Sequence, residues 1–176
     1  MYKIKMMKNW LMAGLILLIM GSCGQSDGDQ KEVHPKVAKL KLPTGFEAEH
    51  LYSPGENDQG SWVGMTFDDK NRLLTVDQYG AIYRLEVPAI GSDSLTPTVQ
   101  KLIIGDQGDD KIGMGYAQAL LYAFNSLYVM VNHRANDDFD KSTGLYRLQD
   151  TNGDDQFDKI TTLKEFTGSP GEHGPH

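Results

Sequence analysis

Short apolar runs separated by turn residues make up most of the chain after residue 42, and two of these runs occur twice. The run 80–85 (GAIYRL) returns at 144–148 (GLYRL), and each copy follows a second apolar run, at 73–76 and at 127–131. A β unit that repeats after about 40 to 60 residues is typical of the blades of a β-propeller. We therefore expect an all-β fold: a partial β-propeller of about two four-stranded antiparallel blades, after an N-terminal signal segment.

Alternation of apolar and polar residues between turn signals predicts nine strands. They are 46–52, 62–67, 73–77, 81–87 and 99–104 in the first unit, and 117–124, 127–132, 144–149 and 160–166 in the second. The blades are expected at about 46–105 and 116–167, with a third beginning at the C-terminal end, so that 42–176 would be the N-terminal part of a propeller. A closed propeller needs about four blades or more. We expect these two alone to be inactive, because their open strand edges favour aggregation.

The first residues have the pattern of an export signal. Lys3, Lys5 and Lys8 precede the apolar run 10–20, which is followed by small residues and the only cysteine, Cys23. This order is typical of a secretory signal, and the run is shorter than the roughly 20 residues that span a bilayer. It also resembles the lipobox of bacterial lipoproteins. The alternatives are an uncleaved anchor helix and a free thiol at Cys23.

On this reading the domains are a lipoprotein signal peptide at 1–22, a flexible polar tether at 23–41 and the β domain. The protein would be exported and held at the membrane through lipidated Cys23, facing the periplasm or the cell surface. The net charge of −7 at pH 7 disfavours nucleic acid as a partner, because phosphates would be repelled. Neutral substrates, cations and proteins fit this charge better.

An acidic segment between the last two predicted strands has the spacing of a calcium loop. Oxygen ligands could come from Asp150, Asn152, Asp154 and Asp158, together with the backbone carbonyl of Gln156. Calcium prefers six to eight oxygens, and a tight loop with carboxylates at alternate positions supplies most of them. The loop departs from the helix-loop-helix pattern, with Asp155 at the sixth position, which is normally glycine. The alternative is a solvated acidic turn.

The glycine-rich segment 168–176 is the second candidate, because its His173 could act as a general base near neutral pH. The alternative is an ordinary loop between blades. In an antiparallel blade the connections alternate between the two faces, which places this segment opposite the acidic loop, so that a bound calcium ion would be structural. Further candidates projected onto the face of His173, for binding a cofactor, are Gln78, Tyr79, His133 and Arg134.

The runs 62–77 and 80–85 resemble the first blade of soluble aldose and glucose dehydrogenases that use pyrroloquinoline quinone. They are closer to the bacterial membrane-bound, sorbosone-dehydrogenase-like propellers, which are often joined to a cytochrome c module. The segment 171–176 is similar to the loop that carries the catalytic base in those enzymes, and the resemblance assigns that role to His173. It implies a quinoprotein-like oxidoreductase acting on a sugar or alcohol, with pyrroloquinoline quinone bound by the full-length protein and an electron acceptor or cytochrome as partner.

The sequence contains no Cys-x-x-Cys-His motif, so this chain binds no covalent haem. Two other functions stay open. One is a non-catalytic propeller that binds glycan or a partner protein at the cell envelope, and the other is a structural lipoprotein module.

Overall fold

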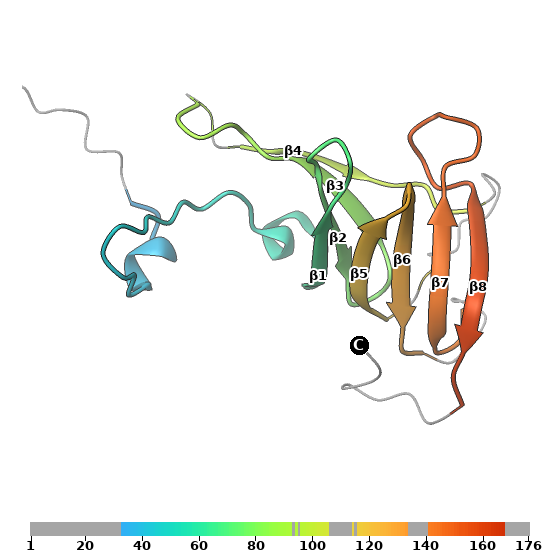
Figure 1. Cartoon of the computed structure of the whole chain (residues 1–176). Helices are drawn as coiled ribbons and strands as arrows, with labels where there is room; N and C mark the ends of the chain where they lie inside the picture. The colour runs from blue at the N-terminus through green and yellow to red at the C-terminus, as the bar shows by residue number, and fades with distance from the viewer. Residues whose placement is uncertain are drawn as a thin grey trace, which may run out of the picture.

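The computed structural model describes residues 33–92, 94, 96–105, 114, 116–133 and 141–167. Eight strands account for most of the regular structure (Figure 1). They are β1 (Trp62–Phe67), β2 (Leu73–Asp77), β3 (Ile82–Glu86), β4 (Thr98–Lys101), β5 (Ala117–Ala123), β6 (Ser126–Val131), β7 (Gly144–Gln149) and β8 (Lys159–Glu165). The only helices among the described residues are two short 3-10 helices, η1 (Val37–Lys39) and η2 (Pro54–Asn57).

The strands form two four-stranded antiparallel sheets, each with its strands in chain order. The first sheet is β1-β2-β3-β4 and the second is β5-β6-β7-β8. Both repeat copies occupy the same place in their sheets, since 82–85 lies in β3 and 145–148 lies in β7, each the third strand. This confirms the prediction of an all-β chain with two four-stranded antiparallel sheets.

One predicted strand is wrong. Residues 46–52 form no strand, and Phe46 is 68% exposed. A strand needs a hydrogen-bonded partner, and residues 46–52 pair with none in the described chain: β1 is the edge strand of the first sheet and pairs with β2. Tyr52 instead stacks on the Trp62 ring at a centroid distance of 5.3 Å. The segment before β1 starts away from the sheets and reaches them near β1 (Figure 1).

The fourth strand of the first sheet is shorter than predicted. It was expected at 99–104 and is found at Thr98–Lys101. Beyond it, Ile104 leaves the first sheet and forms an isolated parallel bridge with Phe157 of the β7–β8 connection. The chain therefore turns toward the second sheet at this point, and the pairing with β3 ends.

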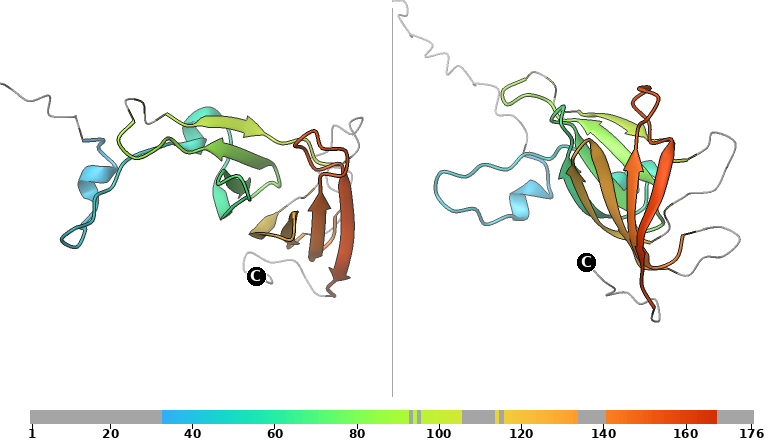
Figure 2. Two further views of the ribbon diagram at one scale, coloured as in Figure 1. Left: turned by 45° about the horizontal axis from the view of Figure 1, so that its top comes forward. Right: turned by 45° about the vertical axis from the view of Figure 1, so that its right-hand side comes forward.

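The main core lies between the two sheets. Its fully buried members include Leu74, Val76 and Ile82 from the first sheet and Val129 and Leu148 from the second. The sheets lie beside each other at an angle, as the two views of Figure 2 show. Burial of these apolar side chains is the main force that holds one sheet against the other.

Gly64 permits the close approach of β1 and β5. A Cβ atom at this position would lie 3.3 Å from the carbonyl oxygen of Gln118 and 3.5 Å from Cα of Ala119. These neighbours are backbone atoms, which cannot rotate away as a side chain could. The absence of a side chain on β1 therefore sets the distance between the sheets at their first strands.

The two sheets pack head to tail: the face of the first sheet that meets the second sheet is not equivalent to the face that the second sheet presents to it. Ile82 and Arg84 of β3 point toward the second sheet, whereas the intervening Tyr83 belongs to a separate cluster on the opposite face. The matching residues of β7 point the other way, since Tyr146 and Leu148 lie in the core between the sheets. The repeat matches Tyr83 with Tyr146, so unlike faces of two similar sheets meet.

No helix in the described part of the chain is long and apolar enough to cross a membrane. The predicted signal peptide, the predicted lipidation site Cys23 and the C-terminal segment 168–176 with its predicted third blade all lie outside the described residues.

Candidate functional site

The acidic loop between β7 and β8 is held by bonds from its own backbone. The two carboxylate oxygens of Asp150 accept hydrogen bonds from the backbone N–H groups of Gly153, at 2.7 Å, and Asp155, at 2.9 Å. The side-chain oxygen of Asn152 accepts one from the N–H of Asp154 at 2.9 Å. The side chains at alternate positions therefore point into the loop, as their spacing predicts.

The end of the loop is closed by Asp158 and Gln156. Asp158 accepts hydrogen bonds from the backbone N–H and the hydroxyl of Thr151, and these bonds hold the pKa of its carboxyl below the usual value. Gln156 donates its N–H to Asp154 at 2.9 Å, and its side-chain oxygen accepts a bond from the N–H of Ile103 at 2.9 Å. The loop is therefore tied to the chain that follows β4.

The predicted calcium ligands share this loop, but their side chains are turned toward backbone donors. Within the described ranges no three or more His, Cys, Asp or Glu side chains form a group that could hold a metal ion. The five predicted positions are Asp150, Asn152, Asp154, Gln156 and Asp158. Calcium at this loop therefore stays a prediction.

Asp155 is the residue that departs from the calcium-loop pattern, and its backbone keeps the conformation that the pattern needs. Its φ is 68°, in the left-handed region where the pattern has glycine. Asp and Asn enter this region more readily than other non-glycine residues. The substitution of aspartate for glycine therefore preserves the turn and adds a carboxylate.

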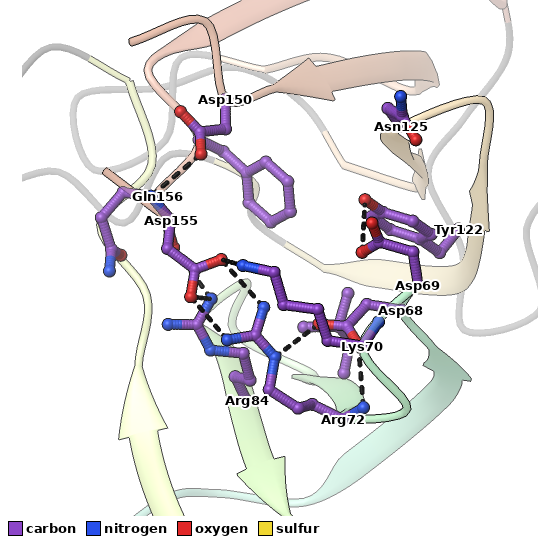
Figure 3. Close-up of a pocket in the computed structure, with 12 residues that line it drawn as sticks. Asp68, Asp69, Lys70, Arg72, Arg84, Tyr122, Asn125, Asp150, Asp155 and Gln156 are labelled. Atoms are coloured by element: carbon purple, nitrogen blue, oxygen red, sulfur yellow. Dashed lines mark hydrogen bonds and ion pairs between the residues drawn. The ribbon is translucent and has the colours of Figure 1, made fainter. Parts of the chain in front are cut away.

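That carboxylate binds three cations of the first sheet (Figure 3). It accepts hydrogen bonds from both terminal nitrogens of Arg72, at 2.5 and 2.8 Å, and from Nζ of Lys70 at 2.9 Å. Nη1 of Arg84 lies 3.1 Å from the carboxylate and donates to the backbone carbonyl of Asp155 at 2.8 Å. We call Lys70, Arg72, Arg84 and Asp155 the inter-sheet junction.

The electrostatics of the junction follow from these contacts. Hydrogen bonds from Arg72 hold the pKa of Asp155 well below its usual range, and the bonds to Asp155 and Asp68 raise the pKa of Arg72. Burial lowers the pKa of Arg84, with the charge of Arg72 acting in the same direction. Asp155 therefore carries its full negative charge at neutral pH.

A cavity of about 160 Å³ lies at the junction, lined by both sheets (Figure 3). On its other side the hydroxyl of Tyr122 donates to Asp69 at 3.1 Å. Burial, followed by the contact with Asp69, raises the pKa of Tyr122 to about 12. Arg72 also binds Asp68 at 2.8 Å, so the cationic side chains of the cavity are balanced by carboxylates. This balance fits a structural joint better than an anion site.

The opposite end of the second sheet has a different character. Three rings from three separate segments meet there: Tyr79 from the β2–β3 turn, Tyr116 just before β5 and His133 just after β6. The Tyr79 and Tyr116 rings meet edge to face at 6.2 Å, and the Tyr116 and His133 rings stack at 4.6 Å. We call these three residues the aromatic ledge.

The ledge brings together two of the predicted cofactor-binding candidates. Tyr79 and His133 are joined through Tyr116, which the sequence analysis did not single out. Gln78 adjoins them and donates its backbone N–H to the carbonyl of Ser61 at 3.0 Å. Arg134 and the predicted catalytic base His173 lie outside the described residues.

Comparison with known proteins identifies no family. No family model matches the chain, and searches of the curated proteins and of the solved structures found no match. These comparisons give no support to the resemblance to quinoprotein dehydrogenases.

Proposed function

We propose that the chain forms two successive blades of a β-propeller in an exported, membrane-anchored lipoprotein. The observation that carries this proposal is the head-to-tail packing of two sheets with the same topology. Contact between unlike faces leaves one face of each type available for a further sheet, and repeated contacts of this kind generate rings or helical arrays. A ring of radial four-stranded sheets is a propeller.

The outer faces of the two sheets support this arrangement. On the first sheet Met65 and Phe67 are exposed. On the second sheet Leu121 is 59% exposed, and Leu163 is exposed as well. The repeat matches Arg147 of β7 with Arg84 of β3, whose guanidinium binds the loop of the following sheet. Exposed apolar side chains on a sheet that also carries the matching arginine are what a third sheet of the same kind would bury.

The function proposed for the full-length protein is oxidation of a neutral sugar or alcohol, as in the quinoprotein dehydrogenases that the sequence resembles. His173 would serve as the base that removes the hydroxyl proton, and the hydride on the neighbouring carbon would pass to a two-electron cofactor outside the described residues, from which a cytochrome or another acceptor would take the electrons. A neutral substrate agrees with the acidic chain and with the aromatic ledge. The propeller fold does not by itself specify this chemistry.

Pyrroloquinoline quinone does not fit the described residues of the ledge. The quinone is a flat tricarboxylate, so its site needs cationic partners as well as rings. Gln78, Tyr79 and Tyr116 supply no cation, and burial lowers the pKa of His133, which favours its neutral form. The described residues of the ledge therefore cannot hold the quinone by themselves.

The experiment that tests the proposed function is a dye-reduction assay. The full-length protein is supplied with pyrroloquinoline quinone and calcium and then offered a panel of sugars and alcohols. We expect substrate-dependent reduction that His173→Ala abolishes. Binding of sugars without any reduction would favour the non-catalytic, glycan-binding propeller instead.

Calcium at the β7–β8 loop is the second part of the proposal. The alternating inward-facing oxygens of Asp150, Asn152 and Asp154 and the left-handed backbone of Asp155 support it. The loop lies at the end of the sheet opposite the ledge, so the ion would stabilise the junction between the sheets and would not contact substrate.

A further inference from the structure

We propose that Tyr79, Tyr116 and His133, the aromatic ledge, bind the ring of a neutral sugar by stacking. The three rings come from different segments, and each contacts the next. The Tyr116 and His133 rings stack and Tyr79 meets Tyr116 edge to face, so the three rings form one aromatic cluster with polar atoms at its edges. This combination suits a ligand that has both a C–H face and hydroxyl groups.

Exposure of the ledge is the first supporting observation. Tyr79 is 47% exposed and Tyr116 is 37% exposed, although both rings are in aromatic contact. Aromatic side chains usually bury most of their area, and an exposed apolar group with polar edges often marks a binding site. Phe124, at the opposite end of the second sheet, is more exposed still but stands in a two-residue turn.

The backbone of Tyr116 is the second supporting observation. Its φ is 39°, a left-handed conformation that bulky residues rarely adopt. The carbonyl of Tyr116 accepts a hydrogen bond from the N–H of Asn132 at 3.1 Å, and Asn132 is buried. Residues held in such strained conformations cluster at functional sites. The bond also holds the backbone of Tyr116 beside residue 132, the neighbour of His133.

The surrounding groups select a neutral ligand. Asp77, which precedes the Tyr79 turn, accepts bonds from the N–H groups of Tyr79, at 2.7 Å, and Ala81, at 3.2 Å. A carboxylate beneath the turn, on a chain of net charge −7, disfavours an anion. The exposed Tyr79 ring offers a face for the sugar C–H groups, and its hydroxyl can bond a sugar hydroxyl.

This inference deepens the proposed function, on which its choice of a sugar rests, but it concerns binding alone. Stacking needs neither the quinone nor His173. Sugar binding at the ledge and sugar oxidation can therefore be disproved independently, and the test measures each of them.

The test is a titration of the full chain with glucose, galactose and their methyl glycosides, followed by tyrosine fluorescence and saturation-transfer NMR. We expect saturable binding that weakens by about tenfold or more in Tyr79→Ala and in Tyr116→Ala. Tyr79→Phe should retain most of the binding, because it keeps the ring. The control is Phe124→Ala, which removes an exposed ring from the other end of the same sheet.

Circular dichroism and thermal melting establish that each variant is folded, and Tyr79→Ala is the decisive variant because its side chain lies in an exposed turn. Three results would overturn the proposal: no sugar binding, equal sugar binding by the parent chain and Tyr79→Ala, or tighter binding of choline than of every sugar. Choline is a cation that aromatic rings also attract. Sugar oxidation by the full-length protein that Tyr79→Ala leaves unchanged would overturn it too. Tyr79-dependent sugar binding without dehydrogenase activity would support the ledge and contradict the proposed oxidation.

Discussion

The carboxylate of Asp155 and the guanidinium of Arg72 form a two-pronged ion pair between residues 83 positions apart in the chain, with N–O distances of 2.5 and 2.8 Å. The pair joins the β7–β8 loop of the second sheet to the start of β2 in the first. A fork of this kind is stronger and more directional than a single bond. It lies at the opposite end of the second sheet from the aromatic ledge.

Stability should fall in acid more steeply for the parent chain than for Asp155→Asn. The folded-state pKa of Asp155 is depressed by its bonds to Arg72, so its contribution is present above the unfolded pKa of about 3.9 and is lost as the pH falls through the folded pKa. Urea unfolding between pH 2 and pH 7 measures this difference. Parallel curves for the two chains would contradict it.

Gly64→Ala should destabilise the chain by about 1 to 3 kcal/mol, because the new methyl group would push the backbone of β5 away from β1. Gly55→Ala is the matched control, since a Cβ atom at Gly55 would meet nothing within 4 Å. Urea unfolding of the two variants gives the comparison. Equal stabilities would show that β1 and β5 do not pack as closely as described.

Calcium should raise the melting temperature, since an ion that binds the folded chain stabilises it by mass action, by about 2.7 kcal/mol at a hundred times the dissociation constant. Asp150→Ala should remove most of this response, because it deletes a proposed ligand at the start of the loop. Glu165→Ala, which removes an exposed carboxylate at the end of β8, should retain it. Melting curves with calcium and with chelator provide the measurement, and curves that coincide would rule out the site.

Local pattern was sufficient for much of the fold. The bounds of β1, β2 and β7 agree with the predicted 62–67, 73–77 and 144–149, because each is a short alternating or apolar run that ends at turn residues. The region 46–52 has the same kind of pattern and forms no strand. A strand at 46–52 would need a partner strand at the edge of a sheet, and whether one is available depends on the whole fold.

The contacts at the two candidate sites were less accessible to sequence reasoning. Asp155 is visible in the sequence as a departure from the calcium pattern, but the cations that it binds are far away in the chain. Tyr116 gave no signal, because it stands alone before β5 and joins Tyr79 and His133 only after the sheets pack. Spacing along a chain predicts which residues share a loop, whereas contacts between sheets depend on their relative placement.

The central claim is that the two sheets are joined head to tail through Asp155, and a double-mutant cycle tests it most directly. The free energies of unfolding of Arg72→Ala, Asp155→Ala and the double variant are compared with that of the parent chain at neutral pH. Because the Asp155 side chain is about a third exposed, we expect a favourable coupling of about 1 to 2 kcal/mol, less than for a fully buried pair. Additive effects, with a coupling close to zero, would contradict the claim.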